Sequence, residues 1–145
     1  MAAGHRLVVV PGLPVAQDGD RFVLTRKFIA GVEEYQRRWP GPLQVVMEPT
    51  HLAGNNLDNV AVSKDELPFE LIVLPYVETE MERVLRGAAL AMLTVHYRQT
   101  HLAEVCARLD VPCTTWLSIP YARGSRSSAW SPPILCGWFA RRSGR

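Results

Sequence analysis

Leu7-Val8-Val9-Val10-Pro11-Gly12 is the stretch of this chain that decides its fold. It is a continuous apolar run, rich in β-branched residues and closed by a proline and a glycine, and such a run is typical of a strand buried on both faces. Strands of this kind occur in parallel sheets that carry helices on both faces. The opening of the chain therefore predicts an α/β domain.

Further apolar runs follow at intervals that leave room for helices between them. We expect strands at residues 43–48, 60–62, 69–74 and 88–95 and from residue 111 onward. The spacing of apolar residues predicts helices over residues 21–38, 79–86 and 99–109. Alternating strands and helices imply a mostly parallel sheet, and right-handed crossovers make it a Rossmann-like, three-layer α/β/α unit.

The first crossover carries the most detailed expectations. Residues 11–20 hold two prolines and two glycines, so they predict a loop. Asp20 is of a residue type that caps helices, and we expect it to cap the helix that follows. Four apolar side chains recur at helical spacing and should face the core: Phe28, Val32, Tyr35 and Trp39. The loop lacks GxGxxG and GxxxxGK[ST], which argues against dinucleotide or nucleoside triphosphate binding there.

Charge divides the chain into two unlike parts. All 14 acidic residues lie between Asp18 and Asp110, so residues 1–112 have 11 basic against 14 acidic side chains, a net charge of −3. The remainder has five basic residues and no acidic ones, a net charge of +5. The overall charge of +2 thus arises from the C-terminal part, and we do not expect a nucleic-acid partner.

Cysteine usage and hydropathy indicate a compartment. Cys106, Cys113 and Cys136 form no CxxC pair and no even disulfide framework, which favours thiols in a reducing cytoplasm. The N-terminal apolar run is too short for a signal sequence. No stretch approaches the roughly 20 apolar residues of a membrane span. We expect a cytoplasmic protein whose contact with membranes is at most peripheral.

Ligands of Rossmann-like sheets bind at the carboxyl ends of the strands. His96 follows the fourth main predicted strand, where a histidine can act as a base or a hydrogen-bond donor. The alternative is a structural histidine that caps the next helix. His96 and His101 are five residues apart and share no helix face, so we expect no metal site.

The first loop offers a second group of candidates. Asp18, Asp20, Arg21 and Lys27 lie in it or just after it, and they could form a lip over a substrate. The alternative is a surface connector that ends in a capped helix.

Five stretches are informative beyond their secondary structure: Arg21-Phe-Val-Leu-Thr-Arg-Lys-Phe28, Arg38-Trp-Pro-Gly41, Asn56-Leu-Asp-Asn59, His96-Tyr-Arg-Gln99 and Leu109-Asp-Val-Pro112. Through them, residues 6–113 resemble the N-terminal half of a two-domain glycosyltransferase of the GT-B fold, of the retaining family-4 type. The chain departs from that family in its first loop, where residues 11–20 replace a paired-glycine loop.

The resemblance implies an acceptor site on this domain and a nucleotide-sugar donor held by a second Rossmann-like domain across a cleft. It implies transfer of a sugar to a glycan or lipid-linked acceptor, in surface polysaccharide or glycolipid assembly, without a cofactor. The implied catalytic residue is His96, and the implied substrate-binding residues are Asp20, Arg21, Lys27, Arg98 and Gln99. Because the donor-binding domain is missing, we expect no turnover from this chain alone.

Two other functions stay open. One is a self-contained Rossmann-like binding module without catalysis, such as a pseudo-enzyme subunit. The other is a flavodoxin-like domain, but the first loop of such a domain binds phosphate and needs more glycine, serine and threonine than residues 11–20 contain.

Residues 114–145 read differently from what precedes them. They hold five arginines, three of the four tryptophans and no acidic residue. In a frame displaced by one base from Thr115, allowed codons encode a strand-like Tyr-Val-Val, and acidic residues return. We expect residues 114–145 to be an irregular tail translated out of frame. The alternative is a genuine Arg/Trp/Ser-rich tail that docks on a partner.

Resequencing the gene tests the reading frame. We expect an uninterrupted frame beyond codon 114 that encodes an acidic, strand-forming continuation of the domain. A stop codon shortly downstream in that displaced frame would contradict the expectation.

Overall fold

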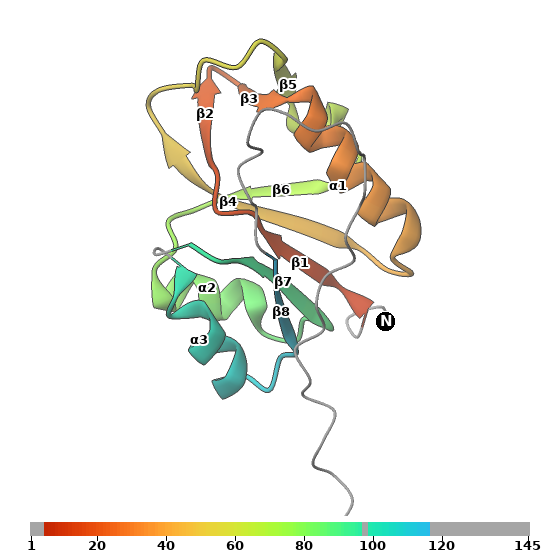
Figure 1. Cartoon of the computed structure of the whole chain (residues 1–145), viewed down its shortest axis with the longest axis vertical. Helices are drawn as coiled ribbons and strands as arrows, with labels where there is room; N and C mark the ends of the chain where they lie inside the picture. Colours follow the sequence, from red (N-terminus) through yellow and green to blue (C-terminus); the bar gives the residue numbers. More distant parts are fainter. Residues whose placement is uncertain (1–4, 97–98, 117–145) are drawn as a thin grey trace, which may run out of the picture.

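The structure is a computed structural model that describes residues 5–96 and 99–116. Arg98 and most of the predicted tail, from residue 117 on, lie outside the described residues. In the described part, eight strands form one mixed, mostly parallel sheet, and three α-helices cover its two faces (Figure 1). The predicted α/β class is therefore confirmed.

Five parallel strands form the centre of the sheet. They are β1 (Leu7–Val10), β4 (Leu43–Thr50), β6 (Glu70–Val73), β7 (Leu90–Thr94) and β8 (Cys113–Trp116). Strand β4 pairs with β1 and with β6, β1 also pairs with β7, and β7 pairs with β8. The spatial order β6-β4-β1-β7-β8 places the first strand in the middle, and the chain order reverses between β1 and β7. This is the arrangement of a Rossmann-like sheet.

An antiparallel extension replaces the predicted first loop, and that prediction was wrong. Strands β2 (Pro14–Asp18) and β3 (Arg21–Thr25) form a hairpin around Gly19 and Asp20. Gly19 has a φ of 62°, which favours glycine in a two-residue turn. On its other edge, β3 pairs with β5 (Asn59–Ser63), which is the short strand predicted at residues 60–62. Strand β2 pairs with the end of β4. Residues 21–25 alternate in burial, as a strand requires.

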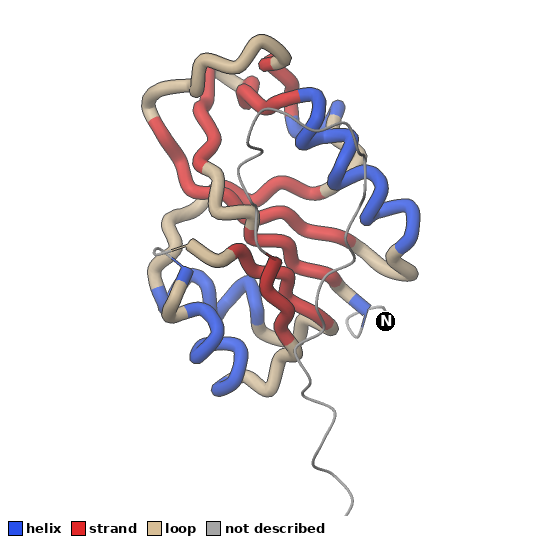
Figure 2. Tube along the Cα trace, in the orientation of Figure 1, coloured by secondary structure: helices blue, strands red, loops and turns tan. Residues whose placement is uncertain are grey.

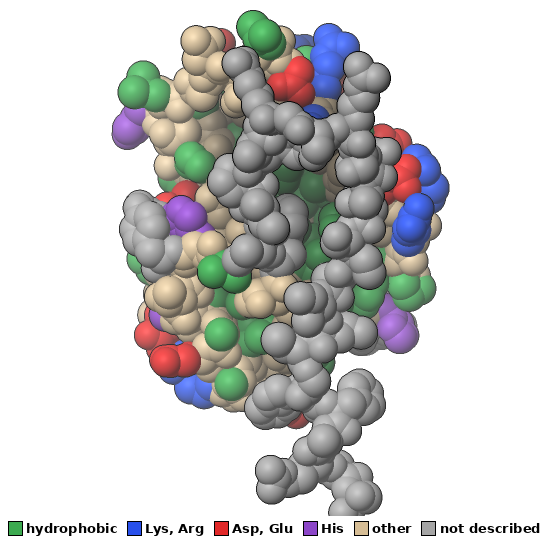
Figure 3. Space-filling model, in the orientation of Figure 1, with side chains coloured by type: hydrophobic (Ala, Val, Ile, Leu, Met, Phe, Trp, Pro, Cys, Tyr) green, Lys and Arg blue, Asp and Glu red, His purple; other side chains and the backbone are tan. Residues whose placement is uncertain are grey.

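The first helix starts later than expected. Helix α1 (Arg26–Arg38) begins after Thr25, whose Oγ1 accepts a hydrogen bond of 3.1 Å from the backbone N–H of Phe28. Thr25 is therefore the N-cap, and the prediction that Asp20 caps a helix from residue 21 was wrong. The predicted apolar face is confirmed, because Val32 is buried and Phe28, Tyr35 and Trp39 pack against the same core cluster. Charged side chains gather along the outer side of α1 (Figure 3).

Helices α2 (Glu78–Leu85) and α3 (Leu102–Arg108) cover the opposite face, as Figure 2 shows. Strand β1 divides its side chains between the two layers. Leu7 and Val9 belong to the core cluster under α1, whereas Val8 and Val10 belong to the cluster under α2 and α3. This alternation confirms the predicted three layers. The predicted helices at 79–86 and 99–109 match α2 and α3, although α3 begins only at Leu102.

Among the described residues, none of the helices has the length and apolar character that a transmembrane helix needs.

Truncation of Leu85 tests the packing of α2 on the sheet. Its side chain is fully buried, at 0% exposure. Leu85→Ala should lower the free energy of unfolding by about 2–5 kcal/mol, because it removes apolar contacts and leaves a cavity. Urea denaturation measures the change. Leu57→Ala, at a fully exposed position, is the matched control and should change the free energy by less than about 0.5 kcal/mol. Equal effects of the two substitutions would contradict this packing.

Candidate functional site

The candidate site is the point between β1 and β7 where the strand order reverses, because Rossmann-like sheets bind ligands there, beyond the carboxyl ends of the strands. We call this point the crevice. A side-chain hydrogen bond joins the ends of β1 and β7 here. The hydroxyl of Thr94, the last residue of β7, donates to the carbonyl oxygen of Val10, the last residue of β1, at 3.0 Å. The two strand ends are thus held together, and the segments that follow them share one edge of the sheet.

Gln99 folds back into this point. Its Oε1 accepts a hydrogen bond of 3.0 Å from the backbone N–H of Thr94. Its own backbone N–H donates to the carbonyl oxygen of His96 at 2.9 Å. Gln99 is 3% exposed and is the one buried polar residue among those that the structure describes. Its side chain is therefore a built part of the crevice and not a surface group.

Gly12 lies against the amide of Gln99. Its φ of 69° is in the left-handed region, which favours glycine. A Cβ atom at residue 12 would lie 2.8 Å from Nε2 of Gln99 and 3.5 Å from the Cβ atoms of His96 and Thr94. Both the backbone conformation and the lack of space therefore require glycine here. The four residues from the two strand ends form what we call the crevice cluster: Gly12, Thr94, His96 and Gln99.

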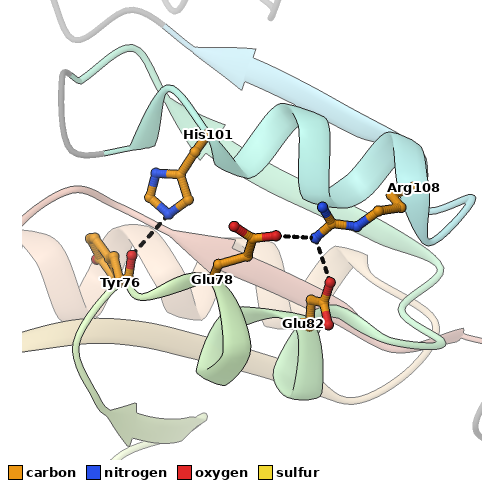
Figure 4. A network of polar contacts seen from close by, with 5 residues as sticks. All are labelled: Tyr76, Glu78, Glu82, His101 and Arg108. Carbon is orange, nitrogen blue, oxygen red and sulfur yellow. Dashed lines mark hydrogen bonds and ion pairs between the residues drawn. The ribbon is translucent and has the colours of Figure 1, made fainter.

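Two further contacts join the neighbouring segments to this edge. Nε2 of the His101 imidazole lies 2.9 Å from the backbone carbonyl oxygen of Tyr76 (Figure 4). A carbonyl oxygen only accepts, so His101 carries a proton on Nε2. The hydroxyl of Tyr76 in turn donates to the carbonyl oxygen of Val46 at 2.9 Å. His101 is thus a structural link between the segment after β7 and the segment after β6.

An ion-pair network holds α2 and α3 together below this edge. Nη2 of Arg108 on α3 lies 2.7 Å from Oε1 of Glu78 on α2 and also contacts Glu82 one turn later (Figure 4). The hydrogen bond to Glu78, followed by that to Glu82, raises the pKa of Arg108 above its ordinary value. These side chains are satisfied by one another, so the network orients the helices and offers no ligand site.

Three predicted substrate-binding residues lie elsewhere. Asp20 is in the exposed turn between β2 and β3, at the top of Figure 1 and away from the end of β7. Arg21 donates from Nη1 to the carbonyl oxygen of Ala61 at 2.9 Å, within the antiparallel extension. Lys27 is exposed in the first turn of α1, where its backbone N–H donates to Oδ2 of Asp58 at 3.3 Å. The structure does not bring these residues to the crevice, and their substrate role stays a prediction.

Arg21 has a second structural contact, since its Nη2 lies 3.8 Å from Oε1 of Glu66. The backbone N–H of Ser63 and then the guanidinium of Arg21 hold the pKa of Glu66 below its ordinary value. Glu66 therefore keeps its negative charge to a lower pH than an isolated glutamate does. Arg21 serves the fold of the extension in this arrangement.

Of the two described cysteines, Cys106 is unsuited to a nucleophilic role. It is a buried residue of α3, and burial, followed by the neighbouring Cys113, raises the pKa of its thiol to about 12. A thiol with this pKa is almost entirely protonated near neutral pH and is a poor nucleophile. Over residues 5–96 and 99–116, no three side chains of His, Cys, Asp or Glu are grouped to hold a metal ion.

The structure brings together two of the predicted residues, His96 and Gln99, and Arg98 lies outside the described residues. Sequence reasoning missed Gly12 and Thr94. Gly12 directly follows the Pro11 that closes the first strand, and this position was the available signal. Thr94 carried none, because its partner Val10 is distant in the chain.

No family model matches this chain, and no curated protein or solved structure does so either.

The link between the strand ends can be tested at Thr94. Thr94→Val removes the hydroxyl that donates to Val10, and it should lower the free energy of unfolding by about 0.5–1.5 kcal/mol because the carbonyl oxygen loses its partner. Urea denaturation measures the loss. Thr115→Val, at an exposed position on β8, is the control. A loss no greater than that of the control would show that the hydroxyl does not hold the two ends together.

Proposed function

We propose that this chain is the acceptor-side, N-terminal domain of a GT-B glycosyltransferase, which transfers a sugar from a nucleotide-sugar donor to a glycan or lipid-linked acceptor. The observation that carries the proposal is the convergence of the crevice cluster at the reversal between β1 and β7. Ligands of Rossmann-like domains bind at this place. The resemblance of residues 6–113 to the family supplies the chemistry.

The chemistry of glycosyl transfer agrees with the residues at the crevice. The acceptor hydroxyl loses its proton as the new glycosidic bond forms, so a polar group beside it assists the reaction. His96 is half-buried at the end of β7, with its Cβ next to Gly12, and an imidazole both accepts and donates protons near neutral pH. We assign His96 to the contact with the reacting groups.

The surface around the crevice agrees with a partner on this side. Three aliphatic side chains at the carboxyl ends of the strands are exposed: Leu13 at 51%, Val77 at 48% and Val95 at 61%. Apolar side chains at a crevice serve the apolar face of an acceptor. They also serve a second Rossmann-like domain, which in this proposal binds the donor and closes over the crevice. We also propose that the transfer to the acceptor takes place in the cytoplasm.

A second candidate is a binding module without catalysis. The buried, unpaired donor on Gln99 favours it, because this feature serves ligand binding and needs no reaction. The two candidates differ in turnover. A gene product that binds a sugar at the crevice but transfers none from any nucleotide sugar would favour the module.

His96→Ala tests the proposed function. The variant is made in the product of the uninterrupted gene, with the donor-binding domain present, and assayed for nucleoside diphosphate release with UDP-, GDP- and dTDP-sugars. We expect kcat to fall at least about tenfold, equivalent to about 1.4 kcal/mol, because a group at the reacting atoms is lost.

His5→Ala is the matched control, because His5 is exposed and lies two residues before the start of β1, at the opposite end of this strand. It should leave kcat unchanged. An equally small effect of both substitutions would remove His96 from the reaction, and a wild-type enzyme without transfer activity would remove the proposed function.

A further inference from the structure

We propose that the side-chain amide of Gln99 is the hydrogen-bond donor for an uncharged ligand oxygen, that of a sugar hydroxyl, in the crevice between β1 and β7. The choice of a sugar rests on the proposed function. The position and orientation of the donor rest on the contacts of Gln99 alone.

The orientation of the amide follows from its partner. Oε1 of Gln99 lies 3.0 Å from the backbone nitrogen of Thr94. A backbone N–H only donates, so the oxygen of the amide must face Thr94 and the NH₂ group must face the other way. The backbone N–H of Gln99 is held by His96 as well. The donor is therefore fixed in place before any ligand arrives, which lowers the entropic cost of binding.

The donor lacks an acceptor. Gln99 is 97% buried, since 3% of it is exposed, and its Nε2 has no hydrogen-bond partner among the described residues. Leaving a buried donor unpaired costs about 1–3 kcal/mol, and native proteins hold few such groups. An oxygen that enters beside Nε2 recovers that free energy. The unpaired amide N–H of Gln99 can therefore bind a ligand oxygen at the point where the strand order reverses.

The direction of approach is set by Gly12. Nε2 lies 2.8 Å from the point that a Cβ of residue 12 would occupy, so the amide nitrogen faces the bare backbone after β1. Nε2 is buried, so an incoming oxygen requires a neighbouring segment to move, and we place this movement at Gly12. Gly12 is suited to this movement because glycine has the widest range of backbone conformations.

The chemistry of the donor favours a neutral ligand, because the amide of Gln99 is itself uncharged. The described segments at the carboxyl ends of the parallel strands are residues 11–14, 48–56, 74–78, 94–96 and 99–101. These described segments contain no lysine or arginine, Arg98 lies outside the described residues, and the carboxylate of Glu78 is paired with Arg108. Phosphate and carboxylate ligands are recognised by charge-assisted donors. A neutral amide beside exposed Leu13 and Val95 instead fits a sugar, which has hydroxyls and an apolar ring face.

The side-chain NH₂ signals of Gln99 provide a direct test by NMR. The ¹⁵N-labelled full chain is titrated with the methyl glycosides of glucose, galactose, mannose and N-acetylglucosamine, and separately with inorganic phosphate. The signals are assigned by their disappearance in Gln99→Leu. We expect a saturable shift with at least one glycoside and none with phosphate. Gln99→Leu should raise the Kd of that glycoside at least about tenfold, the effect of one hydrogen bond.

Two further variants keep the test sound. Gly12→Ala retains the donor but places a methyl group against Nε2, and it should weaken glycoside binding to a similar degree. Gln17→Leu removes an amide that bonds to the carbonyl oxygen of Gly19 in the β2–β3 turn, and it should leave the Kd unchanged. Circular dichroism confirms that each variant is folded.

The outcomes separate this inference from the proposed function. Signals of Gln99 that move with phosphate but with no glycoside, or with no probe at all, overturn the inference. An unchanged Kd in Gln99→Leu does the same. Each of these results leaves the transfer assay to decide the proposed function. A saturable response of Gln99 to a glycoside, in a protein whose uninterrupted gene product transfers no sugar, supports the inference and removes only the catalytic proposal.

Discussion

Strand β1 is constrained on all four sides, and the rest of the domain depends on that constraint. It is hydrogen-bonded to β4 on one edge and to β7 on the other. Its four side chains are at most 2% exposed and alternate between the two core clusters. A shift of one residue would exchange the side chains under α1 with those under α2 and α3, so the register is strongly specified. The crossovers on both faces are positioned relative to this one strand.

The parallel strands could be predicted because their signal is local. A strand buried on both faces is a short apolar run, and neighbouring residues are enough to show it. The hairpin could not be predicted in this way. Phe28, Val32 and Tyr35 have helical spacing, and Asp20 is a good capping type, so the helix was extended back to residue 21. Residues 21–25 are a strand because β2 pairs on one edge and residues 59–63 pair on the other. The pairing with residues 59–63 is distant in the chain.

The same distinction explains the site. The position of His96 and Gln99 directly after an apolar run was sufficient to place them at the ligand-binding edge of a parallel sheet. The role of Gly12 depends on the register between β1 and β7, which brings residue 12 against residue 99, and no local pattern contains that information. The composition of residues 11–20 predicts a loop, and such a loop would place Asp20, Arg21 and Lys27 at the same edge. Once these residues form a hairpin, their side chains are carried away from the crevice.

The junction between β3 and α1 has a mechanical consequence. The strand ends at Thr25 and the helix begins at Arg26, with Thr25 bonded to the first turn, so no linker separates them. The hairpin therefore cannot swing as a flap without rotating a helix of 13 residues whose apolar face is anchored in the core. The extension is therefore a fixed continuation of α1 and of the sheet.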